Sequence, residues 1–228
     1  MLSAVIVAAG KGLRLKTALP KPLVKIGKLP VIAYSLNTLN KHAQVDEIIV
    51  VVNAENQHSI KRIIRGCSFR KIKQVVLGGP WRQDSVYNGL KRVSPKSKWV
   101  LIHDAARPFI DRITISKVIA AARKTGSAIV AVRPKATIKF SGPNNLVAQT
   151  LNRDKLWEVQ TPQVFKKELI LKAYKKYAAS KVTDDAALIE KLGKKVKLVE
   201  GRYENIKITT AEDLLFAGLI AKRLKNAI

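Results

Sequence analysis

The stretch AVIVAAGKGLRLKTALPKPLVK, Ala4–Lys25, decides the fold of this chain. It opens with an apolar run typical of a buried strand, and the run breaks into Gly10-Lys11-Gly12. Small residues and glycines let backbone N–H groups approach a phosphate chain closely, because no Cβ stands in the way. Arg14 and Lys21 follow at fixed offsets, and the prolines on either side of Lys21 restrict its backbone. The pattern predicts a strand followed by a basic phosphate-binding loop.

Two common phosphate-binding motifs do not fit this loop. The Walker A motif and the dinucleotide fingerprint both need a glycine where Leu15 stands. What remains is A-A-G-x-G-x-R, followed six residues later by P-K. That pattern is similar to the signature loop of sugar-nucleotide-type nucleotidyltransferases. The alternative is a strand-to-helix turn that happens to be basic.

The size and composition indicate one globular domain, residues 1–228. Its length allows one sizeable core, and 47% hydrophobic residues with a mean hydropathy of -0.01 are ordinary for a soluble protein. Apolar runs stay far below the ~18 residues that a membrane-spanning helix needs. The single cysteine, Cys67, excludes an intramolecular disulfide. Together with a start that does not look like a signal peptide, it predicts a cytoplasmic protein with no membrane partner.

The formal net charge of +27 exceeds what a polyphosphate site needs. Basic pairs such as Lys166-Lys167, Lys194-Lys195 and Lys222-Arg223 fall on different predicted elements, and aromatic residues are not interleaved with them. We interpret them as a lysine-rich solvated surface. Such a surface predicts weak, salt-sensitive affinity for polyanions and no specific nucleic acid.

Apolar runs alternate with amphipathic stretches along most of the chain, which predicts an α/β fold with a mostly parallel sheet covered by helices. Strands are expected at 4–9, 47–52, 73–77, 99–102, 127–132 and 196–200, and helices at 31–41, 57–65, 84–93, 113–124, 166–179, 186–192 and from 211 onward. Ligands of such sheets lie beyond the carboxyl ends of the strands. The loops at Gly10, Gly79 and Asp104 should therefore converge on one crevice.

The alternation breaks at Arg133. Residues 137–140 and 146–150 read as two strands around the loop 141–145, so a β-hairpin arm is predicted at approximately 133–152. An isolated hairpin of this size is only marginally stable in water. We therefore expect it to pack on its own domain or on another subunit.

Several blocks, taken together, resemble one family. They are A-A-G-K-G-L-R at 8–14, P-K at 20–21, G-G-x-x-R-x-x-S-V at 78–86, H-D-A-A-R-P-F at 103–109, R-x-x-L-W-x-x-Q-T-P-Q at 153–163, T-D-D-A at 183–186 and N-I-K-I-T at 205–209. Their order and spacing are similar to the 2-C-methyl-D-erythritol 4-phosphate cytidylyltransferases. The resemblance implies a Rossmann-like three-layer α/β/α nucleotidyltransferase fold. It also implies cytidylyl transfer from CTP to methylerythritol phosphate in non-mevalonate isoprenoid biosynthesis, with Mg²⁺ assisting.

The resemblance also implies roles for individual residues. The catalytic residues would be Arg14, Lys21, Arg153 and Lys207, of which Arg14 and Lys21 stabilise the α-phosphate. The residues that bind CTP would be Ala8, Ala9, Gly10, Gly12, Arg14, Lys21, Gly79, Arg82, Ser85 and Asp104. Those that bind the alcohol phosphate would be Asp104, Arg107, Thr137, Arg153, Thr183 and Lys207. Asp104 would face the metal, mainly through the CTP phosphates. The arm would cross into a partner's site and give a homodimer with shared active sites.

Alternatives stay open at this point. Ribitol-5-phosphate cytidylyltransferases share many of the same blocks, sugar-1-phosphate nucleotidyl transfer is a more distant possibility, and a basic nucleic-acid-binding protein is a different class. Single residues also have structural interpretations. Arg107 could pair with Asp104, Asp184 could cap a helix, and His103 could be structural.

Overall fold

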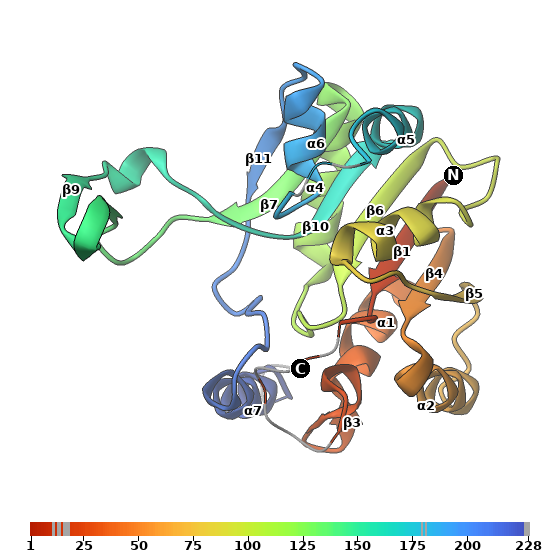
Figure 1. Cartoon of the computed structure of the whole chain (residues 1–228). Helices are drawn as coiled ribbons and strands as arrows, with labels where there is room; N and C mark the ends of the chain where they lie inside the picture. The colour runs from red at the N-terminus through yellow and green to blue at the C-terminus, as the bar shows by residue number, and fades with distance from the viewer. Residues whose placement is uncertain (11, 13–14, 16–18, 179, 181, 226–228) are drawn as a thin grey trace.

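A seven-stranded sheet runs through the centre of the molecule, with the strand order β11-β7-β10-β6-β1-β4-β5 (Figure 1). The computed structural model describes residues 1–10, 12, 15, 19–178, 180 and 182–225. The strands of the sheet are β1 (Leu2–Val7), β4 (Glu47–Val52), β5 (Ile72–Leu77), β6 (Trp99–Asp104), β7 (Ser127–Val132), β10 (Glu158–Lys166) and β11 (Lys197–Glu200). Strand β10 pairs antiparallel with both β6 and β7, and the other neighbours pair in parallel.

Helices cover both faces of the sheet, because successive strand residues point to opposite sides. On one face, Ile6 and its neighbours pack against the helices α1 (Val31–Lys41), α2 (Ala54–Gly66) and α4 (Arg112–Thr125). On the other face, Val5 and its neighbours pack against the helices α3 (Arg82–Leu90), α5 (Lys167–Lys176) and α6 (Ala186–Lys191). The predicted three-layer α/β/α architecture is confirmed.

A smaller third core lies beside the sheet. It joins the last helix, α7 (Ala211–Lys225), to strand β2 (Lys25–Ile26). Strand β2 follows the 3-10 helix η2 (Lys21–Leu23) and pairs with β3 (Leu29–Pro30). Ala217 of α7 packs with Ile26 and Phe109 in this core. The opposite side of α7 leaves Leu215, Phe216 and Leu219 exposed.

One edge of the sheet gathers the loops that matter for function. Strands β1, β4, β5 and β6 are parallel, so their carboxyl ends meet at this edge. The predicted convergence of the loops at Gly10, Gly79 and Asp104 follows from this topology. Strand β7 ends at the same edge, and β10 begins there, since β10 is antiparallel to β7.

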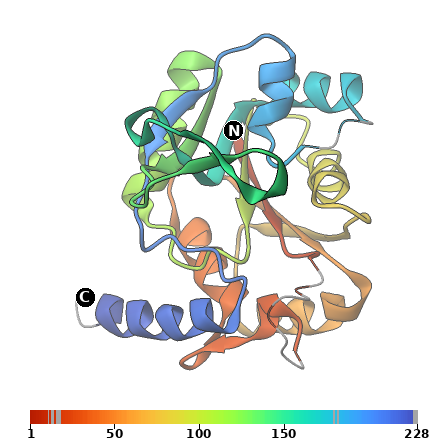
Figure 2. The same cartoon turned by 60° about the vertical axis from the view of Figure 1, so that its left-hand side comes forward.

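The arm spans residues 133–157 between β7 and β10 and stands away from the sheet (Figures 1 and 2). It contains β8 (Lys139–Ser141), η3 (Pro143–Asn145), β9 (Val147–Thr150) and η4 (Arg153–Lys155). Strands β8 and β9 pair antiparallel, which confirms the predicted hairpin, although the arm continues past residue 152. Both strands are exposed along their length, including Phe140 and Val147.

Most elements match the sequence-based expectations. Within the seven-stranded sheet, strand β10 is the exception, because residues 157–163 were not predicted as a strand; the short strands β2 and β3 were not predicted either. Pro162 argues against a central strand, since proline cannot donate to the ladder. Here the ladder with β7 shifts register between Val159 and Gln163, so Pro162 sits at an irregularity in the pairing.

None of the helices in the described part of the chain is long and apolar enough to cross a membrane.

Candidate active site

The loop after β1 is anchored by its backbone. The Ala8 carbonyl accepts a hydrogen bond from Nδ2 of Asn56 at 2.9 Å, and the Ala9 carbonyl accepts one from Nδ2 of Asn53 at 3.3 Å. Asn53 and Asn56 also cap the start of α2 by exchanging side-chain and backbone bonds. The end of β1 and the beginning of α2 are therefore fixed to each other.

Gly12 and Lys21 lie against each other in this loop. Gly12 has φ +67°, a conformation that favours glycine. A Cβ at Gly12 would stand 3.0 Å from Cβ of Lys21, so the glycine lets the two backbone segments meet. Lys21, the first residue of η2, thus sits beside the predicted phosphate loop. Arg14 lies outside the described residues.

The loop between β5 and α3 packs onto the β1 loop. A Cβ at Gly78 would stand 2.5 Å from Oγ of Ser85 and 2.7 Å from Cβ of Ala9, so this position has no room for a side chain. Oγ of Ser85 accepts a hydrogen bond from the Gly79 amide at 3.2 Å. Three of the predicted CTP-binding residues, Ala9, Gly79 and Ser85, are therefore close together.

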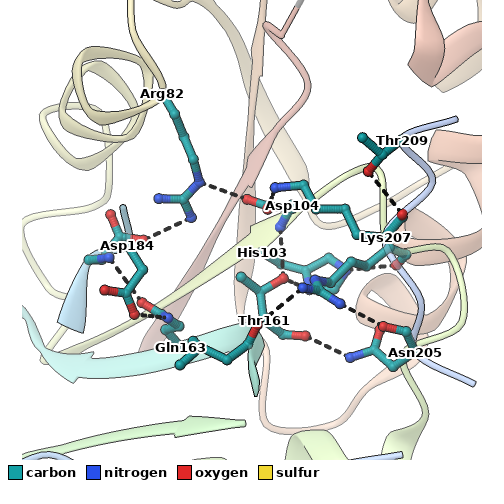
Figure 3. Close-up of polar contacts among 12 residues, drawn as sticks. Arg82, His103, Asp104, Thr161, Gln163, Asp184, Asn205, Lys207 and Thr209 are labelled. Atoms are coloured by element: carbon teal, nitrogen blue, oxygen red, sulfur yellow. Dashed lines mark hydrogen bonds and ion pairs between the residues drawn. The ribbon is translucent and has the colours of Figure 1, made fainter. Parts of the chain in front are cut away.

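Asp104 is the centre of a charged cluster (Figure 3). Its Oδ1 lies 3.0 Å from Nε of Arg82, and its Oδ2 lies 2.6 Å from Nζ of Lys207. Nη2 of Arg82 also lies 2.9 Å from Oδ2 of Asp185. The structure thus brings together Arg82, Asp104 and Lys207, three of the predicted site residues, from widely separated parts of the sequence.

The electrostatics of the cluster follow from these contacts. Burial alone would raise the pKa of Asp104, but Arg82 and then Lys207 outweigh burial and hold that pKa below its ordinary value. Burial would lower the pKa of Arg82, but Asp185 and Asp104 together raise it. Asp104 and Arg82 are therefore both charged at neutral pH.

His103 has a structural role, as one interpretation of the sequence suggested. Its ring is fully buried, with Nε2 3.0 Å from the Arg107 carbonyl and Nδ1 3.0 Å from Oγ1 of Thr161. Oγ1 of Thr161 accepts a hydrogen bond from the Asp104 amide at 3.0 Å. Because the Arg107 carbonyl can only accept, Nε2 of His103 carries the proton, and the Thr161 hydroxyl therefore donates to Nδ1. Burial lowers the pKa of His103 from 6.5 to about 4, which keeps the ring neutral.

Arg107 supports the loop after β6. Its Nη1 donates to the Asn205 carbonyl at 2.7 Å, and its Nη2 donates to the Val159 carbonyl at 3.2 Å. Ion pairs of Asp104 within the described residues go to Arg82 and Lys207, so the alternative of an Arg107–Asp104 pair is wrong. Asn205 donates in turn to the Thr161 carbonyl, which ties the segment before Lys207 to β10.

Other predicted residues lie outside this cluster. Arg153 and Thr137 belong to the arm, where Nη1 of Arg153 donates to the Lys135 carbonyl at 2.9 Å. Thr183 is exposed ahead of α6. Asp184 beside it accepts a hydrogen bond from the Ala187 amide at 3.1 Å, which confirms its interpretation as a helix cap.

Comparisons with known proteins agree with this geometry. A family model described as 2-C-methyl-D-erythritol 4-phosphate cytidylyltransferase matches residues 2–223. The chain belongs to this family. A relative of that name from Desulforamulus reducens is 45% identical over 223 residues, covering 96% of this chain and 95% of the relative. Another from Alkaliphilus oremlandii is also 45% identical, covering 96% and 94%.

Solved structures of the family share the fold. The crystal structure of a 4-diphosphocytidyl-2C-methyl-D-erythritol synthase from Anaerococcus prevotii superposes with a TM-score of 0.87 at 40% identity, covering 97% of this chain and 96% of that one. The 2-C-methyl-D-erythritol 4-phosphate cytidylyltransferase from Thermus thermophilus superposes with a TM-score of 0.78 at 28% identity, covering 97% and 100%. This cytidylyltransferase therefore has the Rossmann-like nucleotidyltransferase fold of its family.

Sequence reasoning missed several residues that hold this cytidylyltransferase site together. Asn53, Asn56 and Tyr174 were not singled out, and Thr161 and Asp185 stood in the Q-T-P-Q and T-D-D-A blocks with no site role assigned. The Asn pair carried a local signal, since two asparagines three positions apart can form a capping box. The others act across the fold, and spacing along the chain does not reveal such contacts.

Proposed function

We propose that this protein transfers the cytidylyl group of CTP to 2-C-methyl-D-erythritol 4-phosphate in non-mevalonate isoprenoid biosynthesis. The products are 4-diphosphocytidyl-2-C-methyl-D-erythritol and pyrophosphate. The observation that carries the proposal is the cluster of Arg82, Asp104 and Lys207 at the sheet edge that also holds the glycine loop, in a chain that matches this family over residues 2–223.

The chemistry needs little from a general base. An oxygen of the acceptor phosphate attacks the α-phosphorus of CTP, a new P–O bond forms, and the bond to the bridging oxygen of pyrophosphate breaks. A phosphate monoester has a second pKa of ~6, so it is mostly dianionic at neutral pH. This agrees with a His103 whose ring nitrogens are both engaged in structural hydrogen bonds. Catalysis then rests on positioning two anions and stabilising charge on the α-phosphate.

The residues divide between the two substrates. Backbone of Ala8 to Gly12 and of Gly79, with Arg82 and Ser85, would hold CTP. Lys21 and Arg14 would stabilise the α-phosphate. Lys207 would receive the alcohol phosphate, together with Arg107, Thr183 and the arm residues Thr137 and Arg153. Asp104 would hold Arg82 and Lys207 at a fixed separation, one on each carboxylate oxygen.

Mg²⁺ would enter this site with CTP. Within the described residues, no group of three or more His, Cys, Asp or Glu side chains is placed to hold a metal ion. Both oxygens of Asp104 already contact cations, so the residues present do not fit a site made by protein ligands alone. Mg²⁺ commonly binds through substrate phosphates with few protein ligands, and in that form it would neutralise triphosphate charge.

The same proposal includes a homodimer in which the arm completes the partner's site. Its support is the exposure of apolar side chains on the arm, where Phe140, Leu146 and Val147 are 59–70% exposed. A two-stranded ribbon of this kind is only marginally stable in water unless another surface packs against it. Arg153 lies on the arm and not in the Asp104 cluster, so a partner's arm is a way to bring that cation to the substrate.

The cysteine content and the net charge bear on where the enzyme acts and on what else it binds. We place the enzyme in the cytoplasm, which agrees with a single and exposed cysteine, Cys67. The net charge of +27 would give it only a weak, non-specific affinity for nucleic acids.

Pyrophosphate release by the purified protein tests the proposal. CTP, ATP, GTP and UTP are each paired with methylerythritol phosphate, and CTP is then paired with ribitol 5-phosphate and with a sugar 1-phosphate. We expect the highest kcat/KM for CTP with methylerythritol phosphate, and no dependence on added RNA at moderate salt. An equal or higher kcat/KM with another acceptor would overturn the acceptor assignment. Sequence-selective RNA binding that survives raised salt would favour the nucleic-acid alternative.

A further inference from the structure

Arg82 is held at two points on one edge of its guanidinium group. Nε contacts Asp104 and Nη2 contacts Asp185, at 3.0 and 2.9 Å. These two nitrogens share one edge of the planar fork, so the edge that carries Nη1 is turned away from both carboxylates. Within the described residues, Nη1 makes no hydrogen bond, so it is left to donate to a ligand.

Asp185 is in turn held by Tyr174. The carboxylate is only 1% exposed, and while its Oδ2 accepts from Arg82, its Oδ1 accepts from the Tyr174 hydroxyl at 2.5 Å. Different donors on the two oxygens fix the rotation of the carboxylate. The backbone amide of Asp185 donates to Oε1 of Gln163 at 3.2 Å, so the main chain is fixed as well.

Tyr174 has its own fixed position. Its ring is buried in α5 and stacks on Tyr87 of α3, with centroids 5.4 Å apart and planes 2° apart. Burial and then Asp185 raise the pKa of Tyr174, so its hydroxyl stays protonated and donates across the physiological range. The chain of contacts therefore runs from the helical layer, through Tyr174 and Asp185, to Arg82 at the sheet edge.

Electrostatic attraction for the nucleotide does not explain why a carboxylate stands at position 185. A carboxylate close to a triphosphate site weakens the attraction of that site for the nucleotide. Asp185 also offsets the positive charge of Arg82, the residue assigned to CTP. The benefit of Asp185 must therefore be geometric.

We propose that Asp185 and Tyr174 are positioning residues that aim the free edge of Arg82 at the nucleotide. The inference rests on the proposed function, in which Arg82 contacts CTP. Without the Tyr174 hydroxyl, the Asp185 carboxylate can rotate and take Arg82 with both oxygens. Such a bidentate pair is a favoured geometry for arginine, and it would draw the guanidinium away from Asp104.

Tyr174→Phe tests the inference, because it removes the hydroxyl and keeps the ring stacked on Tyr87. The matched control is Tyr177→Phe, because the Tyr177 hydroxyl donates to the Lys191 carbonyl at 2.5 Å and has no contact with Asp185. CTP affinity is measured by calorimetric titration with CTP and Mg²⁺, alongside kcat, the KM for CTP and the melting temperature. We expect Tyr174→Phe to weaken CTP binding about tenfold, a change equivalent to about 1.4 kcal/mol, with kcat changed far less. Tyr177→Phe should leave both unchanged.

A double-mutant cycle with Arg82→Gln separates positioning from general loss of structure. If Tyr174 acts through Arg82, Tyr174→Phe has no further effect on CTP affinity in the Arg82→Gln background. An equal loss in both backgrounds, or no loss in either, would overturn the inference. Asp185→Asn approaches the same contact from the carboxylate and should behave like Tyr174→Phe. If Arg82→Gln itself leaves CTP affinity unchanged, the assignment of Arg82 to CTP fails, which is a different result from failure of the positioning role alone.

Discussion

Nζ of Lys207 lies 2.6 Å from Oδ2 of Asp104, although the two residues are 103 positions apart in the chain. Arg82 approaches the other oxygen of the same carboxylate, so Asp104 separates two cations that the sequence does not connect (Figure 3). This arrangement is compatible with the proposed roles, in which Arg82 contacts CTP and Lys207 contacts the alcohol phosphate.

If the two cations serve different substrates, substituting each one should raise the KM for a different substrate. Lys207→Gln should raise the KM for methylerythritol phosphate about tenfold or more, since a charge-assisted contact to phosphate is lost, while the KM for CTP changes little. Arg82→Gln should do the reverse. Steady-state kinetics with each substrate varied in turn measures both values. Lys207→Arg is the matched control and should keep most of the affinity. If both substitutions raised the same KM, the assignment of the cations to separate substrates would be wrong.

Gly12 offers a test of the loop beside Lys21. Gly12→Ala places a Cβ 3.0 Å from Cβ of Lys21 in a backbone with φ +67°, so it should displace Lys21 and lower kcat about tenfold or more. Gly126→Ala is the matched control, because Gly126 has φ +87° and open space around the added Cβ. Both substitutions should cost about 1–2 kcal/mol of unfolding free energy from backbone strain. Only Gly12→Ala should reduce turnover, and an equal reduction by Gly126→Ala would contradict this role of the loop.

The lowered pKa of His103 predicts that the stability of the folded protein depends on pH. The folded protein holds the ring neutral down to a pKa of about 4, whereas the unfolded chain takes up a proton near 6.5. Between these values the unfolded state binds more protons, so the free energy of unfolding should fall as the pH falls from about 6.5 to 4. The loss attributable to His103 is on the order of 3 kcal/mol, since one pKa unit corresponds to about 1.4 kcal/mol.

Denaturant midpoints between pH 7 and 4 measure this slope, and His103→Gln should flatten it. His58→Gln, on the exposed side of α2, is the control and should leave the slope unchanged. His42, whose pKa burial also lowers, is the same in all three proteins and cancels in the comparison. An unchanged slope in His103→Gln would mean that the ring does not take up its proton on unfolding.

Complementation tests the shared site. Lys21→Ala should lower turnover at least ~10²-fold, the scale of losing one preorganised charge at a developing oxyanion. Arg153→Ala should also be nearly inactive. If the arm completes the partner's site, mixing the two variants leaves one intact site in each mixed dimer. Random exchange makes about half of the dimers mixed, so activity should return to roughly a quarter of wild type.

Co-purification of differently tagged subunits must show that exchange has taken place. A site built within one chain would give no recovery, because every site would still lack Lys21 or Arg153. Exchange without recovered activity would therefore exclude the shared site.

Local patterns in the sequence predicted most of the fold. Helix α1 and strands β4 and β7 have the expected bounds, because apolar periodicity is strong there and each element has clear turns at its ends. Helix α2 begins three residues earlier than expected, at Ala54, because Asn53 and Asn56 cap it. Strand β10 was missed because Pro162 interrupts its pattern.

The candidate site was predicted only where its residues fall in compact motifs. Arg82, Asp104 and Lys207 each stand in such a motif, and the parallel sheet brings the motifs to one edge. Asp185 stands in the T-D-D-A block, but that block predicts a helix start and no contact with Arg82, and Tyr174 stands in no motif. A tyrosine on an amphipathic helix looks like core, and an aspartate before a helix looks like a cap. Only the fold shows that the two side chains meet.

The ladder between β7 and β10 begins with Val132 opposite Glu158, immediately at the base of the arm. The arm is therefore an insertion between two strands that pair with each other at its base. The register between β7 and β10 does not depend on the length or sequence of the arm. Mutation can lengthen, shorten or recharge residues 133–157 without moving the loops that hold Lys21, Arg82 or Asp104. In the proposed dimer, acceptor choice and subunit pairing could thus evolve separately from the binding of the nucleotide.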